Sequence, residues 1–281
     1  MKPYYEGWYM KQEQGDDFLA VIPGRAEDNA FIQVVTPQKA RYLAYPLEAF
    51  ERVGPSRGGV PGIRISESFF SPEGMDLNVH QDGIDLEGRL RYRALTPLRY
   101  DIMGPFSLLP METKHTVFSM RHRVDGMVEL DGEEHRFRNA VGYMEGDRGH
   151  SFPRGYTWVQ SVDFDRDASV MVAIAEIPLG IRFTGCIAVV SLDNEEYRLA
   201  TYLGVRIVEA SERVIDLVQR DLRLRVEVRG DEGHRLQAPD QGEMRRVIRE
   251  SPAIPARFTF EKGGRTLLDA VCPHTGYEHV E

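Results

Sequence analysis

The sequence predicts an antiparallel all-β protein built from two barrels, and three observations carry that prediction. Across the 281 residues the dominant hydrophobic period is two rather than 3.6, which is the period of a half-buried strand. Turn signals recur roughly every ten residues, as in sandwiches and barrels. No stretch makes a convincing amphipathic helix, and the best candidate, Glu209–Gln219, is weak. Because an open sheet of so many strands would expose its edges, we expect closed barrels of about eight strands each.

Individual segments justify this fold in order along the chain. Gly83–Arg93 alternates apolar residues with charged ones, so one face of the strand is apolar and the other charged. Arg220–Arg229 repeats the pattern. Two-residue hairpin turns are predicted at Asp131-Gly132 and at Gly263-Gly264, because these residue types tolerate positive φ. Further turns are expected at 165–167 and 193–195.

The length favours two domains, at about 150 residues each. Their seam is expected near Gly142–Gly155, which is rich in glycine, charge and proline. We therefore expect one barrel over residues 1–148 and a second over 149–281. Arg52–Pro61 and Gly230–Gly242 are interpreted as long loops within the domains.

Composition excludes several classes of protein. A net charge of −9 argues against a general nucleic-acid binder. Cys186 and Cys272 are far apart and lack CxxC spacing, so a disulfide-stapled secreted module is excluded and a reduced, cytoplasmic setting is expected. The N-terminus has no apolar targeting core, and the apolar runs are too short for a transmembrane segment.

Sequence motifs for common cofactors and metals are missing. The chain has no phosphate loop, dinucleotide fingerprint, nucleophile elbow or zincin motif. Cys272, His274 and His279 gather near the C-terminus, and His115 lies near His122, but zinc needs three or four convergent ligands. We therefore expect neither a metal nor a cofactor.

One segment has an unusual composition. Gly142–Gln160 combines two carboxylates and a histidine with four aromatic residues; these are Glu145, Asp147, His150, Tyr143, Phe152, Tyr156 and Trp158. Glu145 and Asp147 stand at i and i+2, so in a strand they point to the same side, with Cβ atoms roughly 6–7 Å apart. The alternative interpretation is a polar crossover between domains with a charged tip.

The N-terminus places a further carboxylate among aromatic residues. Glu6 lies between Tyr4-Tyr5 and Trp8-Tyr9. The alternative interpretation of this segment is an edge strand that plugs a barrel.

These two segments resemble the tocopherol cyclase family and its bacterial members. The resemblance rests on YYEGWYMK and FRNAVGYMEGDRGHSFPRGYTWVQS, with weaker similarity in SVMVAIAEIPLGIRFTGCIAVV and YRLATYLGVRI. It runs from residue 4 to Gly276-Tyr277-Glu278. One departure is Arg148, which stands where the family usually has tryptophan. The resemblance implies two lipocalin-like (calycin) barrels packed against each other, distantly related to carotenoid hydratases.

The resemblance also implies an isomerase that closes a prenylated hydroquinone to a chromanol without a cofactor. Such a reaction needs a carboxylic acid kept protonated, a base for the phenol proton and aromatic faces beside the cation. We expect Asp147 or Glu145 to donate the proton, with the other raising its pKa, and His150 to be the base. The residues expected to bind substrate are Trp8, Tyr143, Arg148, Phe152, Tyr156 and Trp158, with Glu6 as a supporting partner.

Arg148 could change this mechanism. A guanidinium that reached Asp147 would hold the carboxylate ionised, whereas an outward side chain would be a surface charge. The competing hypothesis is a non-catalytic carrier of a hydrophobic small molecule, since a barrel of about eight strands can hold one ligand. In either case the expected partner is a lipophilic small molecule, not nucleic acid, and peripheral contact with a membrane would let the protein collect it.

Overall fold

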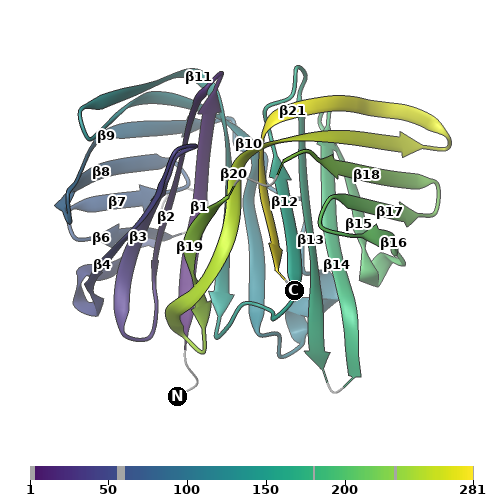
Figure 1. The fold of residues 1–281 in the computed structure, drawn as a ribbon, viewed down its shortest axis with the longest axis horizontal. Coiled ribbons are helices and arrows are strands. Elements are labelled where there is room, and N and C mark those ends of the chain that lie inside the picture. The colour runs from purple at the N-terminus through teal and green to yellow at the C-terminus, as the bar shows by residue number, and fades with distance from the viewer. Residues whose placement is uncertain (1–3, 56–60, 180, 231–232, 281) are drawn as a thin grey trace. The chain divides into compact units, whose positions relative to one another are not determined.

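The computed structural model describes residues 4–55, 61–179, 181–230 and 233–280. These residues form 21 strands and three short 3-10 helices, and the strands pair antiparallel in two large sheets. The predicted all-β class with two antiparallel sheets is therefore confirmed (Figure 1). Among the described residues, no helix is long and apolar enough to cross a membrane.

The first sheet contains β1 (Tyr5–Gln14), β2 (Asp17–Arg25), β3 (Asn29–Val35), β4 (Ala40–Pro46), β5 (Phe50–Pro55), β6 (Pro61–Ile65), β7 (Ser68–Ser71), β8 (Gly74–Gln81), β9 (Ile84–Arg93), β10 (Thr113–Leu130) and β11 (Glu133–Gly149). The second contains β12 (Tyr156–Ser161), β13 (Ala168–Leu179), β14 (Ile181–Leu192), β15 (Glu195–Ala200), β16 (Arg206–Ala210), β17 (Val214–Gln219), β18 (Leu222–Val228), β19 (His234–Asp240), β20 (Glu243–Lys262) and β21 (Arg265–Val280). The 3-10 helices are η1 (Leu47–Ala49), η2 (Gly104–Leu108) and η3 (Thr201–Leu203).

The chain divides into two compact units, and each takes segments from more than one part of the sequence. The first unit comprises Met1–Pro97, His115–Phe152 and Gln237–Arg246. The second comprises Leu98–Lys114, Pro153–Leu236 and Val247–Glu281. Side-chain and backbone hydrogen bonds attach the third segment of the first unit, since the Gln33 amide bonds to the backbone of Gln237 at both N–H and C=O.

The first sheet has the strand order β4-β3-β2-β1-β11-β10-β9-β8-β7-β6-β5. The N-terminal strand β1 is therefore central, between β2 and β11, and the alternative interpretation as an edge strand is wrong. Its near-complete burial explains this position, because both faces of β1 are covered. One contiguous hydrophobic core lines one face of the sheet, and it includes Trp8, Met10, Leu90 and Met144.

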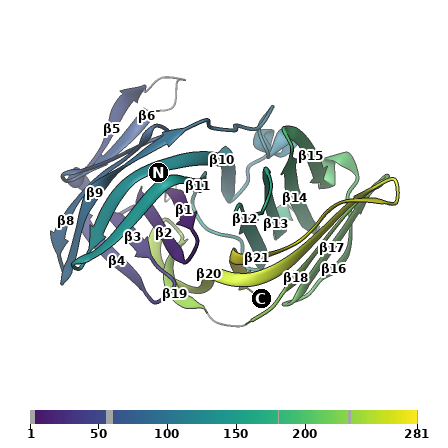
Figure 2. The same ribbon diagram turned by 90° about the horizontal axis from the view of Figure 1, so that it is seen from above.

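The first sheet has eleven strands and the second ten, more than the eight or so expected for each. Glycines help the first sheet to curve, as the bent β10–β11 hairpin shows (Figure 2). Gly88 and Gly126 adopt φ of +146° and +142°, in a region open to glycine alone. A Cβ on Gly88 would lie 2.3 Å from the Met127 carbonyl oxygen, so the strands approach closely there.

The second sheet has the main order β15-β14-β13-β12-β21-β20-β18-β17-β16, with β19 paired to β20. Its core cluster includes Val172, Leu217, Val226 and Phe258. The predicted Gly263-Gly264 turn is confirmed, with φ of 57° and 76° between β20 and β21.

The predicted turn at Asp131-Gly132 is confirmed in the first unit, where φ is 56° and 84° between β10 and β11. The alternating segments also form strands as predicted. In β9 the residues alternate between buried and exposed apart from Gly88, which is half-buried. In β18 Leu224, Val226 and Val228 are buried.

Three local predictions need correction. The weak helix candidate Glu209–Gln219 is instead the β16–β17 hairpin, because alternate residues such as Ile215 and Leu217 are buried. Gly230–Gly242 contains strand β19 rather than being wholly loop, and residues 231–232 lie outside the described residues. In Arg52–Pro61, strand β5 continues to Pro55 and β6 begins at Pro61, while residues 56–60 lie outside the described residues.

Candidate functional site

Strand β11 presents a row of polar residues on the face away from the hydrophobic core. Met144 belongs to the core, so the alternation of a strand turns Tyr143, Glu145 and Asp147 to the opposite face. Tyr143 and Glu145 are buried, whereas the Asp147 side chain is 22% exposed. The pattern predicted that both carboxylates share one side, and in the structure both reach a common partner.

That partner is His115 on the neighbouring strand β10. Its Nδ1 lies 3.0 Å from Asp147 Oδ1, and its Nε2 lies 3.3 Å from Glu145 Oε2. The Tyr143 hydroxyl donates a hydrogen bond to the same Glu145 oxygen. These four residues, which we call the His115 cluster, form a continuous chain of proton-bearing groups from the buried Tyr143 to the more exposed Asp147.

The electrostatics of the cluster favour a charged imidazole. Burial opposes the protonated form of His115, but Glu145 and Asp147 outweigh it and together hold the histidine pKa well above its usual value. The pKa of Tyr143 is also raised, first by burial and then by the charge of Glu145. At neutral pH the cluster therefore contains an imidazolium between two carboxyl groups and a neutral phenol.

Strand β1 lies beside the cluster in antiparallel register. Tyr9 pairs with Glu145 and Gly7 pairs with Asp147, and cross-strand partners share a face. Gly7 has no side chain, so no Cβ stands opposite Asp147. Farther along, Lys11 pairs with Tyr143 and forms an ion pair at 3.1 Å with Glu13, both side chains being fully buried.

Aromatic side chains lie beside Gly7 and two residues before it on β1. The Phe31 ring lies 3.5 Å from the point where a Gly7 Cβ would stand and 2.5 Å from that of Gly24, so two glycines make room for it. Tyr5, two residues before Gly7, makes an edge-to-face contact with Phe152 at 5.6 Å. Because Gly7 pairs with Asp147, the Phe31 ring lies on the face of the sheet that carries this carboxyl group.

His115 was missed by the sequence analysis because of a strand irregularity. An unbroken two-residue hairpin at Asp131-Gly132 would place His115 opposite Arg148 and turn it away from Asp147. Asn139 instead adopts a positive φ of 49°, and its N–H donates to the Asp125 side chain. Beyond it the register has moved by one residue, since Phe118 lies against Gly146. No motif in the sequence signals this shift.

The structure does not bring the other predicted site residues of the first unit into contact with His115. The His150 carbonyl accepts a hydrogen bond from the Gly242 N–H, and the histidine in contact with both carboxylates is His115. Trp8 packs in the hydrophobic core, on the opposite face from the His115 cluster. Arg148 is exposed and alternates with Asp147, so its side chain faces away from that carboxylate. Glu6 faces the same side as Trp8 and pairs with arginines.

Two predicted aromatic residues belong to the second unit. Tyr156 and Trp158 lie on β12, next to β21. The Tyr156 hydroxyl donates a hydrogen bond of 2.5 Å to Glu278. The Trp158 ring occupies the space where Gly276 lacks a side chain.

Two sets of side chains in the described residues are close enough to hold a metal ion. These are the buried His115, Glu145 and Asp147, and the exposed His80, Asp85 and Glu87. In the first set, each carboxylate approaches a different ring nitrogen of His115. One ligand atom from each of the three residues lies within 4.8 Å of the others, although here the two carboxylates contact different nitrogens of the ring. The geometry fits a proton network better than a metal site.

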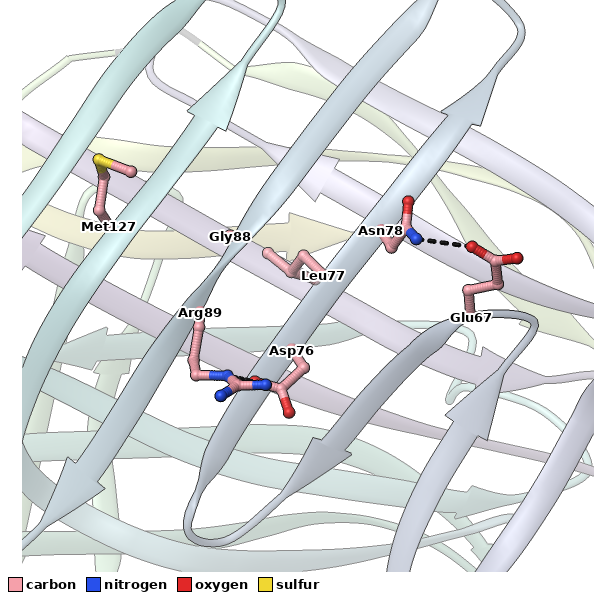
Figure 3. A pocket seen from close by; sticks show the side chains of 7 residues that line it. All are labelled: Glu67, Asp76, Leu77, Asn78, Gly88, Arg89 and Met127. Carbon is pink, nitrogen blue, oxygen red and sulfur yellow. Dashed lines mark hydrogen bonds and ion pairs between the residues drawn. The ribbon is translucent and has the colours of Figure 1, made fainter.

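A shallow depression lies over β8 and β9 and is lined by none of the residues of the His115 cluster (Figure 3). Gly88 is one of the residues that line it. Its charged groups are already paired: Arg89 with Asp76, and Glu67 with the Asn78 amide at 2.6 Å. It therefore offers no reactive group.

Comparisons with known proteins show the fold. No protein-family model and no curated protein matches the sequence, so the tocopherol cyclase resemblance is not confirmed. The structure of CghA with Sch210972 aligns over 99% of this chain and 89% of that chain, at a TM-score of 0.62 and 12% identity. The structure of kievitone hydratase from Nectria haematococca aligns over 99% of this chain and 89% of that chain, at a TM-score of 0.52 and 10% identity. The chain thus shares the fold of these two proteins.

Proposed function

We propose that this protein is an enzyme that protonates an alkene of a lipophilic, prenylated phenol or hydroquinone and closes a chromanol-type ring, as a tocopherol cyclase does. The observation that carries the proposal is the contact of His115 with both Asp147 and Glu145 in a largely buried, aromatic-lined setting. The reaction is an isomerisation, so it consumes no oxidant, reductant or second substrate.

Asp147 is the proton donor in this proposal. Its Oδ1 contacts His115, and in the acid form of Asp147 the proton that is transferred is on Oδ2. A hydrogen bond from His115 stabilises the carboxylate that remains after the transfer. Asp147 is also the most exposed member of the cluster, so a substrate meets it first.

The cation is stabilised by charge and by π faces. Proton transfer to the alkene breaks the Asp147 O–H bond and leaves a tertiary cation beside an anionic cluster. Tyr9 and Phe31 offer ring faces near that position, each worth about 0.5–2 kcal/mol to a neighbouring cation. Attack by the phenol oxygen closes the ring, and the phenol proton returns to a carboxylate of the cluster, directly or through His150.

Two comparisons support a small-molecule enzyme. Kievitone hydratase is an enzyme by name, and the CghA structure contains the compound Sch210972. The alternative, a carrier, would hold its ligand on the core face of a barrel. In the first unit that face is packed with side chains such as Leu90, Phe70 and Met144.

The experiment is to incubate the protein with a prenylated quinol and follow mass-neutral conversion by chromatography. We expect Asp147→Asn to abolish turnover and Glu145→Gln to lower it strongly, with Asp163→Asn in the second unit as the matched control. A wild-type protein that binds the quinol and returns it unchanged would favour the carrier. Full turnover by Asp147→Asn would rule out Asp147 as the acid.

A further inference from the structure

Four strands of the first sheet each carry a charged residue at the same end of the core-facing side. These residues are Glu6 on β1, Arg25 on β2, Arg52 on β5 and Arg148 on β11, and we call them the rim cluster. Each stands an even number of positions from a residue of the core or packed against it; these residues are Trp8, Val21, Phe50 and Met144. Strand alternation therefore turns all four side chains to the core face.

Glu6 is the centre of the rim cluster. The Arg25 Nε donates a hydrogen bond of 2.9 Å to one Glu6 oxygen, and Arg52 donates to the other. Glu6 itself is only 8% exposed. Both oxygens of this carboxylate are thus occupied, and one negative charge is shared between two guanidinium groups.

Arg25 is held in place by aromatic rings. Its guanidinium lies 5.0 Å from the centre of the Tyr4 ring and 5.5 Å from that of Phe50. Stacking of this kind fixes the plane of a guanidinium, so little conformational entropy remains to be lost when a ligand binds.

Arg148 adds a positive charge without an acidic partner. In the strand register Glu6 pairs with Arg25 on one side and with Arg148 on the other. Arg148 is exposed, and no carboxylate in the described part of the chain forms an ion pair with it. The four groups therefore carry a net charge of +2. Two acidic residues follow Arg25 in the sequence. The Glu27 carboxylate accepts a hydrogen bond from the Tyr4 N–H, and the charge of Asp28 contributes to the raised pKa of Tyr42.

We propose that the rim cluster is an anion-binding site that takes a carboxylate or phosphate group, held by Arg148 together with Arg52. Both side chains are open to solvent, and guanidinium groups match the paired oxygens of these anions. The site lies on the opposite face of β1 and β11 from the His115 cluster. It therefore goes beyond the proposed function and does not depend on it.

The surface next to the rim cluster suits an amphipathic anion. The Trp8 and Phe118 rings make a tilted contact, with their centres 5.1 Å apart, one step farther along the core face. Phe50 also packs at this edge, against the core. A chain attached to the anionic group would meet aromatic carbon there, whereas free phosphate would contact the arginines alone.

The test uses isothermal titration calorimetry of the full chain with two probes, inorganic phosphate and dodecyl phosphate below its micelle concentration. We expect Arg148→Gln to weaken binding about tenfold or more, as for loss of a charge-assisted hydrogen bond. Arg138→Gln removes the same charge from the same strand outside the rim cluster, and it should leave binding unchanged. Circular dichroism verifies that both variants are folded.

The two probes also identify the source of the anion. Tighter binding of dodecyl phosphate supports a lipid headgroup, and equal binding supports a free anion. The proposal is overturned if the wild-type protein binds neither probe, if Arg148→Gln binds as tightly as wild type, or if Arg138→Gln weakens binding equally.

Discussion

His115 Nδ1 and Asp147 Oδ1 lie 3.0 Å apart, although 32 residues separate them in the sequence. The contact exists because β10 and β11 pair as one long hairpin whose register moves at Asn139. The other ring nitrogen of His115 faces Glu145, so one imidazole joins two carboxyl groups. In the proposed function this imidazole stabilises the Asp147 carboxylate that remains after proton transfer.

Replacing His115 therefore tests its part in catalysis. We expect His115→Gln to lower kcat for quinol cyclisation by at least about 100-fold, the scale of positioned acid–base catalysis. The control is His80→Gln, because His80 also lies between two carboxylates, Asp85 and Glu87, but on the surface. An equal loss in both variants would show that the effect is not specific to the cluster.

The raised pKa of His115 predicts a loss of stability at high pH. The pKa of His115 in the folded protein lies above the unfolded value of 6.5. The contribution of its protonation to the free energy of unfolding is therefore complete below pH 6.5 and is lost as the pH rises through the folded-state pKa. Within that window, each pH unit costs about 1.4 kcal/mol of the free energy of unfolding. Urea titrations from pH 6 upward should show this decline in the wild type and not in His115→Gln. A parallel decline in both would contradict the assignment.

His122 predicts the opposite behaviour in acid. Burial, aided by Arg121, lowers its pKa to about 3, so it is neutral in the folded protein. Its contribution is present above the unfolded value of 6.5 and is lost as the pH falls toward about 3. At pH 5 the loss amounts to about 2 kcal/mol. As the pH falls, urea titrations should show a smaller decrease in the free energy of unfolding in His122→Leu than in the wild type. An equal decrease in the two proteins would be evidence against a buried neutral His122.

Gly88 is predicted to be irreplaceable for the curvature of the first sheet. Gly88→Ala would combine a φ of +146° with a Cβ only 2.3 Å from the Met127 oxygen. We expect it to lower the free energy of unfolding by roughly 2–4 kcal/mol. Gly54→Ala is the matched control, since nothing lies within 4 Å of its Cβ position and its φ is ordinary. Thermal or urea denaturation of the two variants measures the difference.

The fold could be predicted because it depends on local signals. The alternation in Gly83–Arg93 and the Asp131-Gly132 turn each act over a few residues, and both appear in the structure as expected. Strand number was harder to predict, because short strands such as β7 leave little pattern. Glycine kinks such as Gly88 also interrupt the alternation.

The site could be predicted only in part. Glu145 and Asp147 were found because i and i+2 in one strand share a face. His115 depends on a register shift at Asn139, which is a property of strand pairing rather than of composition. Trp8 was expected beside the substrate, but its position in β1 turns it into the core. Which face of a central strand carries chemistry depends on what covers each face, and one strand's sequence does not contain that information.

The most direct test of the central claim is to run the reaction in deuterium oxide and measure the mass and NMR spectrum of the cyclised product. Alkene protonation by the cluster predicts one carbon-bound deuterium per product molecule, at the former alkene carbon, with no product formed by Asp147→Asn. A cyclised product without carbon-bound deuterium would contradict the account.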